Sequence, residues 1–141
     1  HGLHSFLEAL DELKLENNFN PETIEEIEIE TNPSWLKVCN IEKPKTGLES
    51  KFSYKLTAAM SIFGKDTSDL DTYSDDICID DNMNNIRDKV RVIPNDQLSN
   101  TQSLISIKDG SRDIKNKHDL SDKIDNNLLE TKIFFINLRL V

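Results

Sequence analysis

Histidines and lysines are the side chains of this sequence best suited to acid–base chemistry and anion binding. His1 and His4 lie about one helical turn apart at the start of the sequence. An unperturbed imidazole has a pKa of about 6.5 and can hold or transfer a proton at cellular pH. Lys51 and Lys55 have the spacing that places two residues on one face of a helix, where like charges repel mildly and an anion between them is favoured. His118 lies in a charged stretch, where we expect it to be solvated.

The acidic residues and the cysteines predict no metal site. Four aspartates lie between residues 75 and 81, but they lack the alternating oxygen ligands and the glycine of a calcium-binding loop. A solvated acidic face is the better interpretation of this stretch. Cys39 and Cys78 form no CxxC motif and no zinc-ligand spacing, so we expect two reduced thiols. We therefore predict no metal and no cofactor.

The composition argues against several classes of function. A formal net charge of −9 and a pI near 4.8 argue against binding to nucleic acid or to an anionic membrane surface. The sequence has no run of about 18 apolar residues, so no segment is expected to span a bilayer. Two reduced thiols and the lack of a visible signal peptide predict a cytoplasmic protein.

The length of 141 residues fits one domain with its own core. The hydrophobic fraction of 36% is low for a self-sufficient domain. The sequence also begins with His1 rather than methionine and opens directly into helical sequence, so we interpret it as a piece of a longer protein. Some apolar surface is then expected to be completed by a missing part or a partner, although a small core with long polar loops would give the same fraction.

The clearest element of the sequence is a predicted helix from Thr46 to Gly64. Thr46 and Glu49 form a capping box at its start, and Gly64 supplies the left-handed residue at its end. Its apolar face is predicted to contain the residues that recur at helical spacing, Leu48, Phe52, Leu56, Ala59 and Phe63. Its polar face is predicted to contain Ser50, Tyr54, Thr57 and Ser61.

Shorter patterns predict an α+β fold. Three segments alternate as strands do, at residues 26–31, 89–93 and 104–107, and Asp109-Gly110 is a hairpin signal with a returning arm over 112–117. Helical patterns cover residues 3–14, a short turn after Asn20-Pro21, a weak stripe over 66–81, a short helix over 82–87 and the first half of 128–141. The second half of that last segment fits helix or strand. Strands linked by hairpins or separated by helices indicate two layers, with a small antiparallel sheet packed against helices.

Three segments occur in a characteristic order: the first ten residues, Glu49 to Gly64, and Leu104 to Gly110. They resemble, respectively, the histidine-led helix, the "AKFS" helix and the strand ending in an Asp-Gly turn of the MmgE/PrpD family. That family includes 2-methylcitrate dehydratase, cis-aconitate decarboxylase and iminodisuccinate epimerase. The resemblance implies that residues 1–141 form a single C-terminal domain whose helical N-terminal domain is absent. Beyond Ser111 the family's glycines and prolines are missing, so the match is weaker there.

The resemblance also implies a reaction and a site. The family's lyases are metal-independent and remove water or carbon dioxide from small di- or tricarboxylates, or epimerise a related diacid. Such chemistry needs cations that hold carboxylates, an acid or base beside the reacting carbon, and donors for the developing charge. His4 matches the family's histidine and is the implied catalytic residue, while His1, Lys51 and Lys55 are implied to bind the substrate. Dehydration of a 2-methylcitrate-like substrate is the default reaction, and a homodimer is expected.

Other roles remain open for these residues and for the chain. His4 can instead cap or pack the first helical turn, and Lys51 can pair with Glu42, Glu49 or a carboxylate of the sheet. The alternative function is a stand-alone, non-catalytic α+β module that binds an anionic ligand or a protein partner; a degraded gene remnant is a third interpretation. An exposed apolar patch beside His4 would favour the lyase fragment, which alone should hold half an active site, whereas a closed surface would favour the module.

Overall fold

A computed structural model describes residues 2–120 of the chain. The predicted final element over 128–141 and His1 lie outside the described residues. The elements follow in the order α1 (His4–Glu16), β1 (Ile24–Thr31), α2 (Pro33–Leu36), α3 (Gly47–Ser50), α4 (Tyr54–Ile62), the 3-10 helix η1 (Leu70–Thr72), α5 (Asp75–Cys78), α6 (Asp81–Arg87), β2 (Val90–Pro94), β3 (Gln102–Asp109) and β4 (Arg112–Asp119).

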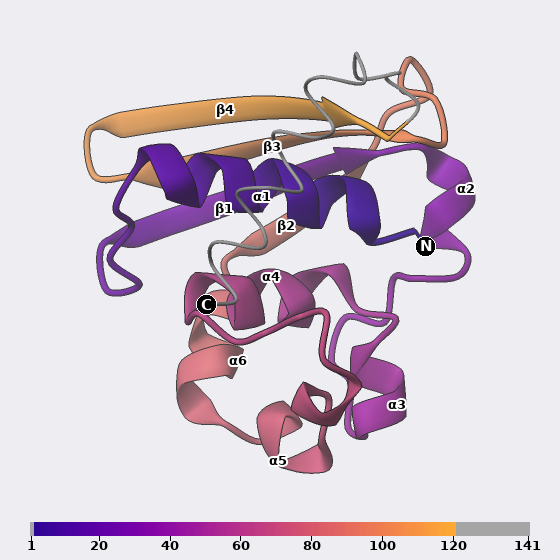
Figure 1. Ribbon diagram of the computed structural model, residues 1–141, viewed down its shortest axis with the longest axis vertical. Coiled ribbons are helices and arrows are strands. Elements are labelled where there is room, and N and C mark those ends of the chain that lie inside the picture. The colour runs from indigo at the N-terminus through magenta and orange to yellow at the C-terminus, as the bar shows by residue number, and fades with distance from the viewer. Residues whose placement is uncertain (1, 121–141) are drawn as a thin grey trace, which may run out of the picture.

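The described strands form one four-stranded sheet in the order β2-β1-β3-β4. The β1–β3 and β3–β4 pairs are antiparallel, as predicted, whereas β1 and β2 are parallel. The parallel pair follows from the chain path, because all the helices from α2 to α6 connect these two strands. In Figure 1, α1 lies against the sheet, α4 runs beside α1, and α3, α5 and α6 lie beyond α4. The α+β fold class is therefore confirmed, with a sheet that is mixed and mostly antiparallel.

Strict alternation along β1 separates the core from the outer face of the sheet. Ile27 and Ile29 are fully buried, while the glutamates between and beside them are partly exposed on the other face. From the helical side, Phe6 and Leu10 of α1 complete this core with no exposed surface. The alternation along β1 and the helical spacing along α1 both agree with the sequence patterns.

The predicted helix from Thr46 to Gly64 is broken in two. Thr46 caps α3 as expected, its Oγ1 accepting a hydrogen bond from the Glu49 amide at 3.1 Å. The helix then stops, and Ser53 caps a new helix by accepting a hydrogen bond from the Leu56 amide at 3.1 Å. Between them the Phe52 carbonyl accepts a hydrogen bond from the Ile41 amide at 3.1 Å. Gly64 ends α4 with a φ of 75°, as predicted.

Because of this break, the predicted polar face is wrong and the predicted apolar face is confirmed only in part, at Leu56 and Ala59, which are fully buried. Leu48 and Phe52 are 68% and 38% exposed, whereas the side predicted to be polar is buried. The buried hydroxyls find local partners: Ser50 donates to the Gly47 carbonyl at 2.5 Å, and Thr57 donates to the Ser50 carbonyl at 3.3 Å. The helical spacing counted from Leu48 holds only within one continuous helix. Because Ser53 caps a new helix, that spacing does not describe which residues of α4 face the core.

The remaining local predictions are partly confirmed. The short helix over 82–87 is α6, and the Asp109-Gly110 hairpin forms with Gly110 at a φ of 61°. The stripe over 66–81 is not one helix, because it divides into η1 and α5. The residues after Asn20 form a turn rather than a helix.

Tyr54 generates the first prediction. The ring is fully buried, its hydroxyl donates to the Gly2 carbonyl at 2.8 Å, and its oxygen accepts from Thr31 Oγ1 at 3.2 Å. Replacing Tyr54 by phenylalanine leaves two buried groups without a partner, and should lower the free energy of unfolding by about 1–3 kcal/mol in urea titrations. Tyr73→Phe is the control, because its partly exposed hydroxyl makes one bond, to the Thr67 carbonyl. An equal loss in both variants would contradict this role for Tyr54.

The buried hydroxyl of Tyr54 should also make the fold less stable at alkaline pH. Burial raises the pKa of Tyr54 from 10.0 to about 12, against a smaller lowering by the hydrogen bond from Thr31. Because the folded state has the higher pKa, this contribution is complete below pH 10 and is lost as the pH rises towards 12. Urea midpoints measured at pH 9 and pH 11 should therefore fall further for the wild-type chain than for Tyr54→Phe. A parallel fall in both chains would contradict the prediction.

Candidate functional site

Helices α1 and α4 run side by side in the same direction. At their starts, the Tyr54 hydroxyl of α4 donates to the Gly2 carbonyl just before α1. At their ends, Lys14 Nζ donates to the Ser61 carbonyl at 2.5 Å. Both helices therefore begin on the same side of the molecule, at the right of Figure 1. Since the start of a helix carries partial positive charge, two positive ends lie on this side.

The start of α1 is packed closely against α2 and the segment after it. A Cβ added to Gly2 would lie 2.6 Å from Trp35 Cε3 and 2.8 Å from Cys39 Sγ, so only glycine fits without displacement. The Trp35 indole is fixed in turn by its hydrogen bond to the Asn100 carbonyl at 2.6 Å. Burial raises the pKa of the Cys39 thiol, which keeps it protonated as a packing group.

His4 is the first residue of α1, and its side chain is exposed. The N-cap position belongs to Leu3, which makes no side-chain capping bond. Leu3 therefore occupies the position expected of a capping residue, and the exposure of His4 argues against a packing role. The imidazole lies at the helix start, where the resemblance places an acid–base group.

Lys51 and Lys55 lie on either side of the helix break rather than on one helix. Lys55, in the first turn of α4, forms an ion pair with Glu42 at 3.3 Å. Glu49 is engaged at the start of α3, where its carboxylate accepts a hydrogen bond from the Lys45 amide at 3.2 Å. Within residues 2–120, the Lys51 side chain has no hydrogen bond or ion pair, so the pairings considered for it do not form. Lys51 is the cation of this pair that is open to a ligand.

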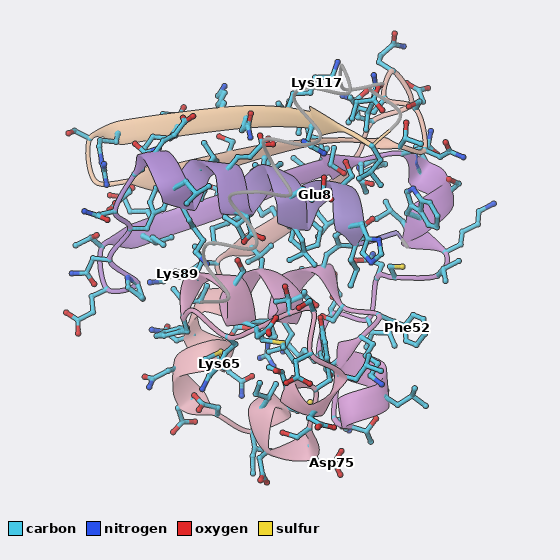
Figure 2. All side chains as sticks on the ribbon, in the orientation of Figure 1. Glu8, Phe52, Lys65, Asp75, Lys89 and Lys117 are labelled. Carbon is cyan, nitrogen blue, oxygen red and sulfur yellow. The ribbon has the colours of Figure 1, made fainter. Side chains whose placement is uncertain are left out.

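The chain around residues 39–41 and 52–54 leaves some of its side chains without contacts among the described residues. Residues 39–41 and 52–54 pair as two short antiparallel stretches, through Asn40 and Ser53. Val38 is 56% exposed, and Phe52 points outward on the side where α1 and α4 begin (Figure 2). Asn40 Oδ1 is buried without a hydrogen-bond partner among the described residues. Exposed apolar side chains and an unsatisfied acceptor therefore accompany the cations at this end.

His118 is a titratable side chain that sequence reasoning placed wrongly. It lies in β4 rather than in a solvated loop, and its side chain is only 10% exposed. Its two ring nitrogens face carboxylate oxygens of Glu8 and Glu12 in α1. The missed signal is the alternation of Ile114, Asn116 and His118, which continues the strand beyond its predicted end and onto its inner face.

The acidic stretch has structural roles. Asp75 accepts a hydrogen bond from the Gly47 amide at 2.7 Å, and Asp80 caps α6. A shallow polar hollow of about 120 Å³ lies elsewhere, on the outer face of the sheet, lined by Glu26, Glu28, Ser106, Lys108 and Asp113. In the part of the chain that the structure describes, no group of three His, Cys, Asp or Glu residues could hold a metal ion. No helix among residues 2–120 is long and apolar enough to cross a membrane.

The fold and this end of the molecule define the class of protein: an α+β domain that presents cationic side chains where two parallel helices begin. Comparison with protein families gives the particular family. The model described as the MmgE/PrpD C-terminal domain matches residues 1–132, so the chain belongs to the MmgE/PrpD family as its C-terminal domain. A search of curated proteins finds no match. The family resemblance stated from the sequence is thus confirmed.

The close packing around Gly2 predicts that a larger residue at this position destabilises the fold. Gly2→Ala places a methyl group against the Trp35 ring and Cys39 Sγ, and should lower the free energy of unfolding by about 1–3 kcal/mol, measured in urea. In a Trp35→Ala background the same substitution should cost less, because the nearest obstacle is gone. Equal costs in the two backgrounds would show that the indole does not limit the space at Gly2.

Proposed function

We propose that the domain forms one wall of an interdomain active site in an MmgE/PrpD-like lyase that acts on a small di- or tricarboxylate. The observation that carries the proposal is the parallel pairing of α1 and α4, fixed at both ends by Tyr54 and Lys14. Dehydration of a 2-methylcitrate-like substrate is the default reaction, and decarboxylation and epimerisation are its alternatives.

The electrostatics of this end support a carboxylate ligand. Two helix starts side by side repel each other, and an anion bound near both would relieve that repulsion by roughly 0.3–1 kcal/mol for each helix. Lys51 adds a full positive charge without a protein partner among the described residues, although the chain as a whole carries −9. Lys55 can add a second charge when a substrate carboxylate competes with the exposed Glu42.

The proposed roles follow from the chemistry of carboxylate lyases. Removing a proton beside a carboxylate places negative charge on that group, which Lys51 and Lys55 would stabilise. His4 would transfer the proton, either from the carbon or to the leaving hydroxyl. His1 would assist substrate binding. The remaining groups would come from the helical N-terminal domain of the same cytoplasmic protein, working as a homodimer without a metal or cofactor.

A non-catalytic module that binds an anion or a protein partner is the second candidate. The Lys55–Glu42 ion pair favours it, because a paired lysine needs no substrate. The exposed Phe52 and Val38 and the unsatisfied Asn40 favour the lyase fragment instead, because they leave a surface for another part of the protein to complete.

A turnover assay on the full-length protein tests the proposal. With 2-methylcitrate and cis-aconitate as substrates, His4→Ala should lower kcat/KM by roughly 10²-fold or more, the size expected for a positioned acid–base group. Activity that does not change with His4→Ala would support the enzymatic function but would show that His4 takes no part in catalysis. Inactivity on both compounds would favour another diacid or the binding module.

Lys51→Ala tests the anion site in the same assay. Loss of a charged contact to a substrate carboxylate should raise KM by roughly tenfold or more, corresponding to about 1.5–3 kcal/mol. Lys65→Ala is the matched control, because this exposed lysine lies just beyond the other end of α4 and its loss changes the net charge equally. Similar KM values for the two variants would argue against a ligand at Lys51.

A further inference from the structure

One residue of β4 contacts α1 at three points. The His118 carbonyl accepts a hydrogen bond from Ser5 Oγ at 3.2 Å. Its Nε2 contacts Glu8, and its Nδ1 lies 3.2 Å from Glu12 Oε1. Figure 2 shows Glu8 on α1 and Lys117, the residue before His118, pointing away from that helix. His118 is thus the inward-facing residue of this pair.

Both ring nitrogens of His118 lie against carboxylates of α1. Each nitrogen faces a carboxylate oxygen, and an imidazole can donate to both only when both nitrogens carry hydrogen. The attraction between an imidazolium and a carboxylate is stronger where water is largely excluded. Because the ring is only 10% exposed, water competes weakly for its nitrogens, and the three contacts fix the orientation of α1 against β4.

The start of α1 is therefore held from two opposite neighbours. Tyr54 holds Gly2 from α4, and His118 holds Ser5 and Glu8 from β4. His4 lies between these attachment points and is itself exposed. We propose that His118 is a positioning residue, which through α1 sets the orientation of His4 in the active site. This inference rests on the proposed function for the role of His4, but the geometry of the attachment is independent of it.

Amide hydrogen exchange tests the attachment without any assay of activity. The Leu7 amide donates to the Leu3 carbonyl at 3.1 Å and so reports on the first turn of α1. In the chain of residues 1–141, His118→Leu should speed exchange of this amide by roughly tenfold. His118→Gln, which keeps a donor for one carboxylate, should give a smaller increase and remains informative where the leucine variant does not fold.

Asn116→Ala is the matched control. Asn116 also joins β4 to α1, donating to the Ala9 carbonyl at 3.0 Å and to Glu12 at 2.8 Å, but both contacts lie further from the start of α1 than Glu8, which the His118 side chain contacts. Its removal should therefore lower overall stability while leaving exchange at Leu7 close to that of the wild type. Unchanged exchange in both His118 variants, or equal acceleration in Asn116→Ala, would overturn the proposal.

Kinetics of the full-length protein test the consequence for His4. His118→Leu should lower kcat by roughly tenfold with little change in KM, because a displaced acid–base group affects the chemical step more than binding. Asn116→Ala should retain kcat. An active enzyme whose kcat is unaffected by His118→Leu would overturn the positioning role. If the protein turns over no carboxylate, the proposed function fails, and the exchange at Leu7 still decides whether His118 fixes the first turn.

Discussion

The hydrogen bond from the Tyr54 hydroxyl to the Gly2 carbonyl is the constraint on which this end of the domain depends. It joins the start of the first helix to the start of the fourth, across more than fifty residues of chain. The buried phenol has to find partners there, because an unsatisfied hydroxyl in the core would be costly. Its partners lie just before α1 and in β1, so one side chain brings both helical starts to the sheet.

This arrangement leaves Lys51 without an ion-pair partner among residues 2–120 in a strongly acidic chain. Acidic side chains are used elsewhere: along the outer face of β1, as helix caps, and against His118. At the helical starts, the parallel dipoles and Lys51 act together over a short range. Net charge governs long-range attraction, whereas these local charges decide which group is held once it arrives.

Local patterns predicted most of the fold, and long-range contacts account for the rest. The alternation of glutamate and isoleucine predicted β1, and Asp109-Gly110 predicted the β3–β4 hairpin. Both predictions succeeded because these elements depend on residues that are close in sequence. The helix break at Ser53 was missed, since serine fits both a helix face and an N-cap, and only the pairing of Phe52 with Ile41 selects the cap. His118 was missed for a similar reason: its carboxylate partners are more than a hundred residues away. His4 and Lys51 remain predictions, and they come from family resemblance rather than from a physical pattern.

The edges of the sheet have a consequence for assembly. Within residues 2–120, β2 and β4 are the two outer strands, and unpaired strand edges tend to recruit other chains into continuous sheets. Pro94 removes a backbone donor at the end of β2, while Lys115 and Lys117 place charge along β4. Both edges therefore resist strand addition, which protects the domain against sheet-mediated aggregation.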